Sequence, residues 1–283
     1  MDRLKLQGLF LTCGLLIAAM RGQTPKPLPD VRKLMDEVRE HQRQLDKVRE
    51  NYTFTSFNKN EELDAHGAVK KTETNELECF FVNSHQICRA VQKDGKPLDD
   101  KEEKKETERV TKLVEKAGKT PPEQPLEGQS VSISRVLSLM DVSSPRRVEF
   151  RGRATIVFDF IGRKDAKASG MAENASKKLK GTIWIDEADR EISHLEVLFM
   201  DDYKIAGGLL ATIDKGSTFK FDQAPIEGDL WLPTGVEADV KARVLMFKGE
   251  RDHFEETDTK FQRFNVQTVQ QKSVAVEGTA AKP

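Results

Sequence analysis

The fold is decided by Lys180-Gly-Thr-Ile-Trp-Ile-Asp-Glu-Ala-Asp-Arg-Glu-Ile-Ser-His-Leu-Glu-Val-Leu-Phe199, which contains two β-strand patterns joined by a turn. Residues 180–186 and 191–199 alternate between apolar and polar side chains, as a strand with one buried face does. The four residues between them, Glu187-Ala-Asp-Arg190, are polar and suit a tight connection. This stretch therefore predicts an antiparallel hairpin with one apolar face.

Further strand patterns lie on both sides of this hairpin. Short turn-forming segments such as Ala65-His66-Gly67 and Asp94-Gly95 separate them. Consecutive strands with few helices between them favour one curved antiparallel sheet. The strands that we expect lie near residues 52–57, 69–82, 85–91, 153–162, 209–213, 218–221, 231–240, 242–247 and 260–266.

Two longer helical patterns accompany these strands. Asp30 is a good N-cap for a helix that ends near Glu50, and the apolar residues of this segment recur at spacings of three and four. A charged helix is expected over residues 97–118, where Asp99 and Glu102 have the spacing of a capping box.

A third, short amphipathic helix is expected near residues 133–140, whereas the polar segment 163–178 is expected to be a loop. The fold class is therefore α+β. We expect an unclosed β-barrel, or curved antiparallel sheet, with the N-terminal helix and the two central helical segments packed on it.

The first 22 residues have the pattern of a signal peptide. Arg3 and Lys5 precede an apolar stretch of 12 residues, Leu9–Met20. This stretch is shorter than the roughly 20 residues that span a bilayer. We expect cleavage near Gln23 and a periplasmic or secreted protein; an uncleaved membrane anchor is the alternative.

The expected mature chain is one domain over residues 23–267, followed by a polar tail over residues 268–283. It keeps 43 basic and 46 acidic residues, so its formal net charge is −3. No basic stripe is present, which argues against a nucleic-acid partner because binding to a phosphate backbone needs one. We expect a monomer.

Two cysteines remain after the leader is removed, and they are placed symmetrically about a turn. If Asn83-Ser84 forms a two-residue hairpin turn, Cys79 and Cys88 face each other on a non-hydrogen-bonded pair. The two Cα atoms then lie within reach of a disulfide, and oxidising compartments preserve such bonds. Two unrelated buried thiols are the alternative.

No catalytic, cofactor or metal motif is evident, and we do not expect an enzyme. The five histidines are scattered, without the spacing of a zinc site. His253 and Glu255 would share a face of a strand, where either a metal pair or a solvated polar strand end is possible. Asp186 and Asp189 are interpreted as turn residues because they lack the spacing of a calcium loop.

Three stretches of the second half resemble a known family. They are Gly181-Thr-Ile-Trp-Ile-Asp186 with its return strand, Gly228-Asp-Leu-Trp-Leu-Pro-Thr234, and Phe261-Gln-Arg-Phe-Asn-Val266. They resemble the lipoprotein-carrier superfamily (LolA/LolB-like), which includes exported bacterial proteins of unassigned role. The resemblance implies an unclosed barrel with an apolar cavity that shields acyl chains. It implies no site residue, because the carriers' functional arginine matches no position here.

An apolar cavity would be lined by alternating residues of two expected strands. Their polar neighbours, such as Asp159 and Glu196, indicate that only one face avoids water. An ordinary filled core beneath the N-terminal helix is the alternative. The expected lining residues are Phe158, Phe160, Leu195, Val197 and Phe199.

Two functions fit this interpretation. The first is a non-enzymatic periplasmic carrier that holds an acyl chain or other apolar ligand, with transient membrane contact possible. The second is an envelope interaction or sensor module that binds a peptide or protein. A hydrolase with a site assembled from scattered residues is a third and weaker hypothesis.

Overall fold

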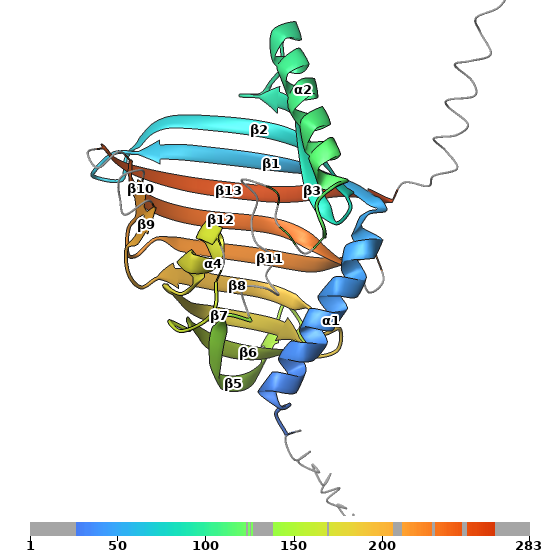
Figure 1. The fold of residues 1–283 in the computed structure, drawn as a ribbon, viewed down its shortest axis with the longest axis vertical. Helices are drawn as coiled ribbons and strands as arrows, with labels where there is room; N and C mark the ends of the chain where they lie inside the picture. The colour runs from blue at the N-terminus through green and yellow to red at the C-terminus, as the bar shows by residue number, and fades with distance from the viewer. Residues whose placement is uncertain are drawn as a thin grey trace, which may run out of the picture.

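A computed structural model describes residues 27–122, 124, 126, 138–168, 170–205, 211–227, 230–244 and 248–263. Within these residues one antiparallel sheet dominates, and its strand order is β4-β3-β2-β1-β13-β12-β11-β8-β7-β6-β5, with β10 joining β12 and β9 (Figure 1). The two end strands, β4 and β5, do not pair with each other, so the sheet is antiparallel and unclosed, as expected. The expected signal peptide, and the tail over residues 268–283, lie outside the described residues.

The elements follow in this order along the chain: α1 Val31–Arg49, β1 Tyr52–Leu63, β2 Val69–Val82, β3 His85–Lys93, β4 Lys96–Pro97, α2 Asp100–Ala117, β5 Met140–Phe150, β6 Arg153–Gly162, α4 Gly170–Ser176, β7 Leu179–Asp186, β8 Ile192–Phe199, β9 Tyr203–Ile205, β10 Ala211–Ile213, β11 Thr218–Glu227, β12 Leu230–Val244 and β13 Lys248–Arg263. The expected hairpin over residues 180–199 is formed by β7 and β8, with Ile183 paired to Leu195 as the alternation requires.

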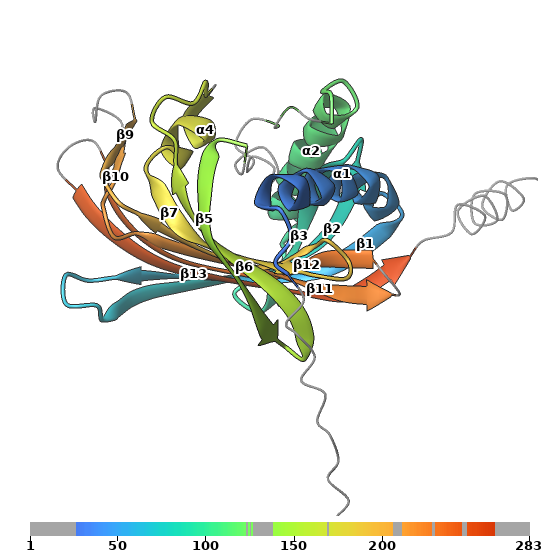
Figure 2. The same cartoon turned by 90° about the horizontal axis from the view of Figure 1, so that it is seen from below.

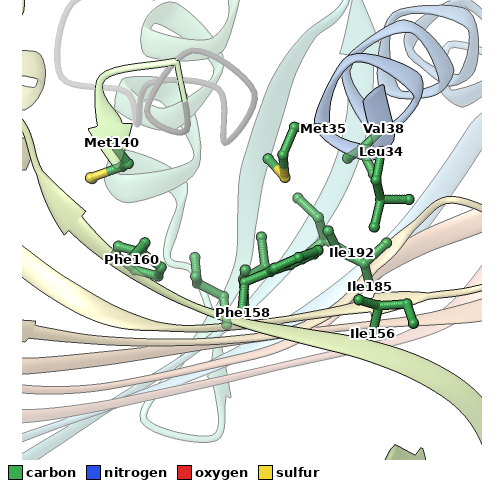
Figure 3. Packing of buried hydrophobic residues seen from close by; sticks show 11 residues of the cluster. Leu34, Met35, Val38, Met140, Ile156, Phe158, Phe160, Ile185 and Ile192 are labelled. Atoms are coloured by element: carbon green, nitrogen blue, oxygen red, sulfur yellow. The ribbon is translucent and has the colours of Figure 1, made fainter. Parts of the chain in front are cut away.

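Helix α1 crosses one face of the sheet, called here the α1 face (Figure 2). Asp30 caps it as expected, since its carboxylate accepts a hydrogen bond of 2.9 Å from the Lys33 amide. Leu34, Met35 and Val38 form the helix side of the main core. They pack against buried apolar residues of β6, β7 and β8, and Figure 3 shows Phe160 on the side of Phe158 away from the helix.

The second long helix, α2, has the predicted capping box at Asp99 and Glu102. It lies at the β3 end of the sheet rather than over its centre, because its apolar patch, which includes Ala117, packs with Ile87 of β3 and Phe80 of β2. Of the two central helical segments expected on the sheet, α2 is therefore at an edge.

The other central segment, near residues 133–140, falls mostly on residues 131–137, which lie outside the described residues. Its last residue, Met140, begins strand β5, which was not predicted. This strand is hard to find in the sequence because it is the polar edge of the sheet and pairs on one side only, with β6.

Three further expectations need correction. The segment 163–178 was expected to be a loop, but it contains the short helix α4. Strand β12 runs through Lys241 without a break, whereas two strands were expected there. Strand β13 begins at Lys248 instead of near residue 260, because its backbone is paired on both sides even where its side chains are polar.

The cysteine hairpin has the expected register. Asn83 and Ser84 have φ angles of 49° and 64°, which is the left-handed conformation of a two-residue hairpin turn. Cys79 lies opposite Cys88 with a Cα–Cα distance of 4.1 Å, and the two are joined by a disulfide. The bond cross-links β2 and β3 next to Phe54, a buried residue of β1 that pairs with Cys79.

Candidate functional site

The registers of the central strands place one row of side chains across the α1 face. Phe158 of β6 pairs with Ile183, Ile183 with Leu195, and Leu195 with Phe221 of β11. A parallel row runs from Phe160 through Gly181, Val197 and Phe219. Opposite residues in paired strands project to the same side, so the apolar residues of β6, β7, β8 and β11 form one continuous surface.

Coverage of this surface changes along the strands. The end beneath α1 is buried, as Ile183, Ile185 and Ile192 show. Farther from the helix, the side chains retain contact with water. We call the latter group the apolar strip: Leu179, Val197, Phe199, Phe219 and Phe221.

The five residues expected to line a cavity all lie on this face. Phe158, Phe160 and Leu195 are 0%, 5% and 6% exposed and belong to the packed core that includes α1. Val197 and Phe199 belong to the apolar strip. The structure therefore brings the five together and divides them between a filled core and a partly uncovered surface.

Gly181 occupies the middle of the second row and shapes the strip. A Cβ atom at this position would lie 2.6 Å from Phe160 Cζ and 1.9 Å from the Glu196 carbonyl oxygen. The Phe160 ring thus lies over the glycine, where any side chain would displace it. Sequence reasoning missed Gly181, Phe219 and Phe221, although the alternation of Phe219 and Phe221 in an expected strand was a usable signal.

Beyond β11 the same face stays apolar on β12, at Val236 and Ala238, and is mixed on β13, where Phe254 is followed by acidic residues. Phe221 pairs with Val236 of β12, and Val236 pairs with Glu256 of β13. The next residue of β13 on this face is Asp258, which is 4% exposed and opposite Ser56 of β1.

Asp258 is unusual among the described acidic residues because it is buried and neither of its carboxylate oxygens has a hydrogen-bond partner. Burial and the neighbouring Glu256 carboxylate raise the pKa of Asp258 to about 7. The facing Ser56 hydroxyl lowers this pKa by a smaller amount, but it hydrogen-bonds to Asn58 Oδ1 at 3.0 Å. Burial also raises the pKa of Glu256.

The residues considered for metal binding have other partners. His253 Nδ1 lies 2.9 Å from Asp239 Oδ1, and His253 Nε2 lies 3.1 Å from Glu255 Oε1. These two carboxylates raise the pKa of His253. The described part of the chain holds no group of three or more metal-ligating side chains arranged around a common point.

Asp186 and Asp189 are turn residues, as expected. Asp186 Oδ1 accepts hydrogen bonds from the amides of Ala188 and Asp189, at 3.0 and 2.8 Å. The Arg153 side chain of β6 pairs with both carboxylates and so joins the β7–β8 turn to β6.

His41 received no role from its sequence context, and the structure places it at an anchor of α1. Its Nδ1 lies 2.8 Å from Oε1 of Glu191, a fully buried carboxylate that also hydrogen-bonds to Gln42. Both helix residues thus fix α1 to the turn between β7 and β8. These contacts with Glu191 hold α1 over one end of the apolar surface.

Comparison with known proteins assigns no family to this chain. No protein-family model and no curated protein matches the chain. One similar solved structure is described as an outer membrane lipoprotein-sorting protein domain from Vibrio parahaemolyticus, with 10% identity, a TM-score of 0.37, and coverage of 85% of this chain and 99% of that one. Another is MucB in complex with MucA(peri), with 8% identity, a TM-score of 0.25, and coverage of 82% and 100%. Both TM-scores are below 0.5, so the function proposed for this chain is inferred from its own residues.

Within the described residues, no helix is both long enough and apolar enough to cross a membrane.

Proposed function

We propose that this protein is a non-enzymatic binding protein of the periplasm, or a secreted one, that holds an acyl chain or another apolar ligand against the apolar strip. The observation that carries the proposal is the strip itself. Four of its five side chains pack against the filled core, and all five stay partly uncovered on the face that α1 only partly spans. Adjoining apolar side chains that the fold leaves partly uncovered can bury further surface against an apolar ligand.

Binding would follow from removal of apolar surface from water. Each square ångström of apolar surface buried contributes about 25 cal/mol, so covering several phenylalanine and valine side chains supports affinity without any directed chemistry. The register arranges the strip in rows across β7, β8 and β11, onto which a flexible chain can lie. Helix α1, held through Gln42 and Glu191, forms one wall of this surface.

A fluorescent apolar probe tests the proposal. Phe219→Ser should weaken probe binding about tenfold or more, because it removes a large apolar contact worth about 1.5–3 kcal/mol. Phe57→Ser is the matched control, since Phe57 is 46% exposed and lies on the opposite face of β1. Equal probe binding by the two variants and the wild type would refute a site on the strip.

Molecules released from protein isolated from its native envelope would identify the ligand class. A fatty acid or phospholipid detected by mass spectrometry supports the carrier. A clean protein that retains a peptide favours the interaction module instead. N-terminal sequencing of the exported form tests the compartment, because we expect a start within a few residues of Gln23, and an intact Met1 would favour a membrane anchor.

A further inference from the structure

The α1 face carries two acidic side chains on β13, and one of them lies in a row that begins in the apolar strip. The row runs from Phe221 through Val236 to Glu256 and continues to Asn58 of β1. Neighbouring strands are about 4.8 Å apart, so the acidic strand β13 lies roughly 10 Å from the apolar strand β11. A ligand of modest length that lies on the strip thus reaches the acidic residues.

The Asp258 carboxylate is buried and has no hydrogen-bond partner. It is 4% exposed, both of its carboxylate oxygens lack a partner, and Glu256 is next to it on the same face. A buried carboxylate without partners is costly, and proteins pair such groups with a cation or with hydrogen-bond donors. The Ser56 hydroxyl that faces it hydrogen-bonds to Asn58 instead.

Two basic side chains of β1 and β13 are engaged on the other face. Lys59 pairs with Glu61 at 2.8 Å and with Glu255, and Lys260 pairs with Glu76. Among the described residues, no ion pair joins a basic side chain to Asp258. The Asp258 carboxylate is therefore left for a group that comes from outside the described part of the fold.

We propose that the ligand is a cationic amphiphile, whose apolar chain lies on the strip and whose primary ammonium group binds the carboxylate of Asp258 beside Glu256. This inference rests on the proposed function of the strip. An ammonium group is compact and has three donors, and the Asp258 oxygens and the Glu256 carboxylate offer acceptors for them.

Two other ligands fit the acidic residues less well. A divalent cation such as Ca²⁺ is usually held by several carboxylates, whereas the described residues hold no group of three or more acidic, histidine or cysteine side chains around one point. A basic amphipathic peptide would have to bring a long side chain to a carboxylate that is 96% covered, as its 4% exposure shows. A single-chain amine must reach the same carboxylate, but it brings only a narrow chain to it and no peptide backbone.

The test compares dodecylamine with dodecanol, which has the same chain and no charge. Both are titrated at pH 8 as competitors of the fluorescent apolar probe, below the concentrations at which they aggregate. We expect the wild type to bind dodecylamine about tenfold or more tightly than dodecanol, because hydrogen bonds to charged groups contribute about 1.5–3 kcal/mol. Asp258→Asn should reduce this ratio to about one to two, and Glu256→Gln should reduce it partly.

Glu255→Gln is the matched control. It removes the same charge from the same strand, but Glu255 lies on the opposite face beside His253. It should leave the ratio at the wild-type value. Circular dichroism of each variant establishes that it is folded, and Glu256→Gln provides a second measurement if Asp258→Asn does not fold.

The outcomes separate the two proposals. If dodecanol and dodecylamine displace the probe equally well, the apolar site stands and the ammonium site is refuted. If Asp258→Asn and Glu256→Gln keep the tenfold preference, the ammonium group binds elsewhere and the inference is wrong. If neither compound displaces the probe, the proposed function fails and this inference fails with it. Displacement by a basic amphipathic peptide but not by dodecylamine would replace the small amphiphile with a peptide ligand.

Discussion

The substitution Asp258→Asn should make the protein more stable at alkaline pH. The carboxyl of Asp258 has its pKa raised from 3.8 to about 7 by burial and by Glu256. A change of this size corresponds to about 4 kcal/mol, because each pKa unit is worth about 1.36 kcal/mol. Ser56, which faces Asp258 on β1, is not titratable, and Asn58 and Val236 face Glu256, so Glu256 is the neighbour that titrates with Asp258.

The sign follows from proton binding. Between about pH 4 and pH 7 the folded state holds a proton on Asp258 that the unfolded chain has released, so the free energy of unfolding falls as pH rises through this range. About 2–3 kcal/mol of the total effect lies between pH 5 and pH 8. Asparagine has a similar shape and no charge, so the variant should gain about this amount relative to the wild type over the same interval.

Urea denaturation of both proteins at pH 5 and pH 8, followed by circular dichroism, measures this difference. Asp141→Asn is the control, because Asp141 is exposed on edge strand β5 and its substitution should shift stability equally at both pH values. If Asp258→Asn keeps a constant stability difference from the wild type between pH 5 and pH 8, Asp258 is either ionised in contact with water or paired, and the buried-carboxylate description is wrong.

Three further substitutions probe the fold. Replacing Cys79 and Cys88 together by serine should lower the free energy of unfolding by about 2–3 kcal/mol, because the closed loop is short; in the mature protein without its leader, thiol labelling after denaturation without reductant should find no free cysteine, and two reactive thiols would contradict the bond. Gly181→Ala should destabilise by about 1–3 kcal/mol or more, since its methyl group would overlap the Glu196 carbonyl oxygen, and an unchanged denaturation midpoint would contradict this close approach. Phe158→Ala should cost about 3–5 kcal/mol in chemical denaturation, because the side chain is 0% exposed in the core beneath α1; a loss below about 1 kcal/mol would show that the core is not filled there.

The alternating apolar pattern predicted the central hairpins well. The β7–β8 hairpin, the N-cap at Asp30 and the disulfide register about Asn83-Ser84 are local features, and each depends on residues close together in sequence. Residues 131–137, where most of an expected helix falls, lie outside the described residues.

The polar strands were harder to predict. Strands β5 and β13 carry mostly charged and polar side chains, so their alternation gives no apolar signal. They are strands because neighbouring strands supply backbone hydrogen bonds along their length, which is a property of the assembled sheet. The acidic position of the candidate site was missed for this reason, since Asp258 lies in the unpredicted part of β13.

Local residue patterns were enough to predict an antiparallel sheet, the α1 packing stripe, the disulfide pair and which residues of β6 and β8 share an apolar face, because side-chain periodicity and turn chemistry act locally. Which of those apolar residues are filled core and which remain partly uncovered depends on where α1 is anchored by Glu191, and this contact is between residues far apart in sequence. The assembled sheet also places Glu256 in an apolar row, with Asp258 next to it on the same face. Strand β13 joins the sheet between β12 and β1, strands far from each other in sequence, and the pairing across them sets which side chains meet.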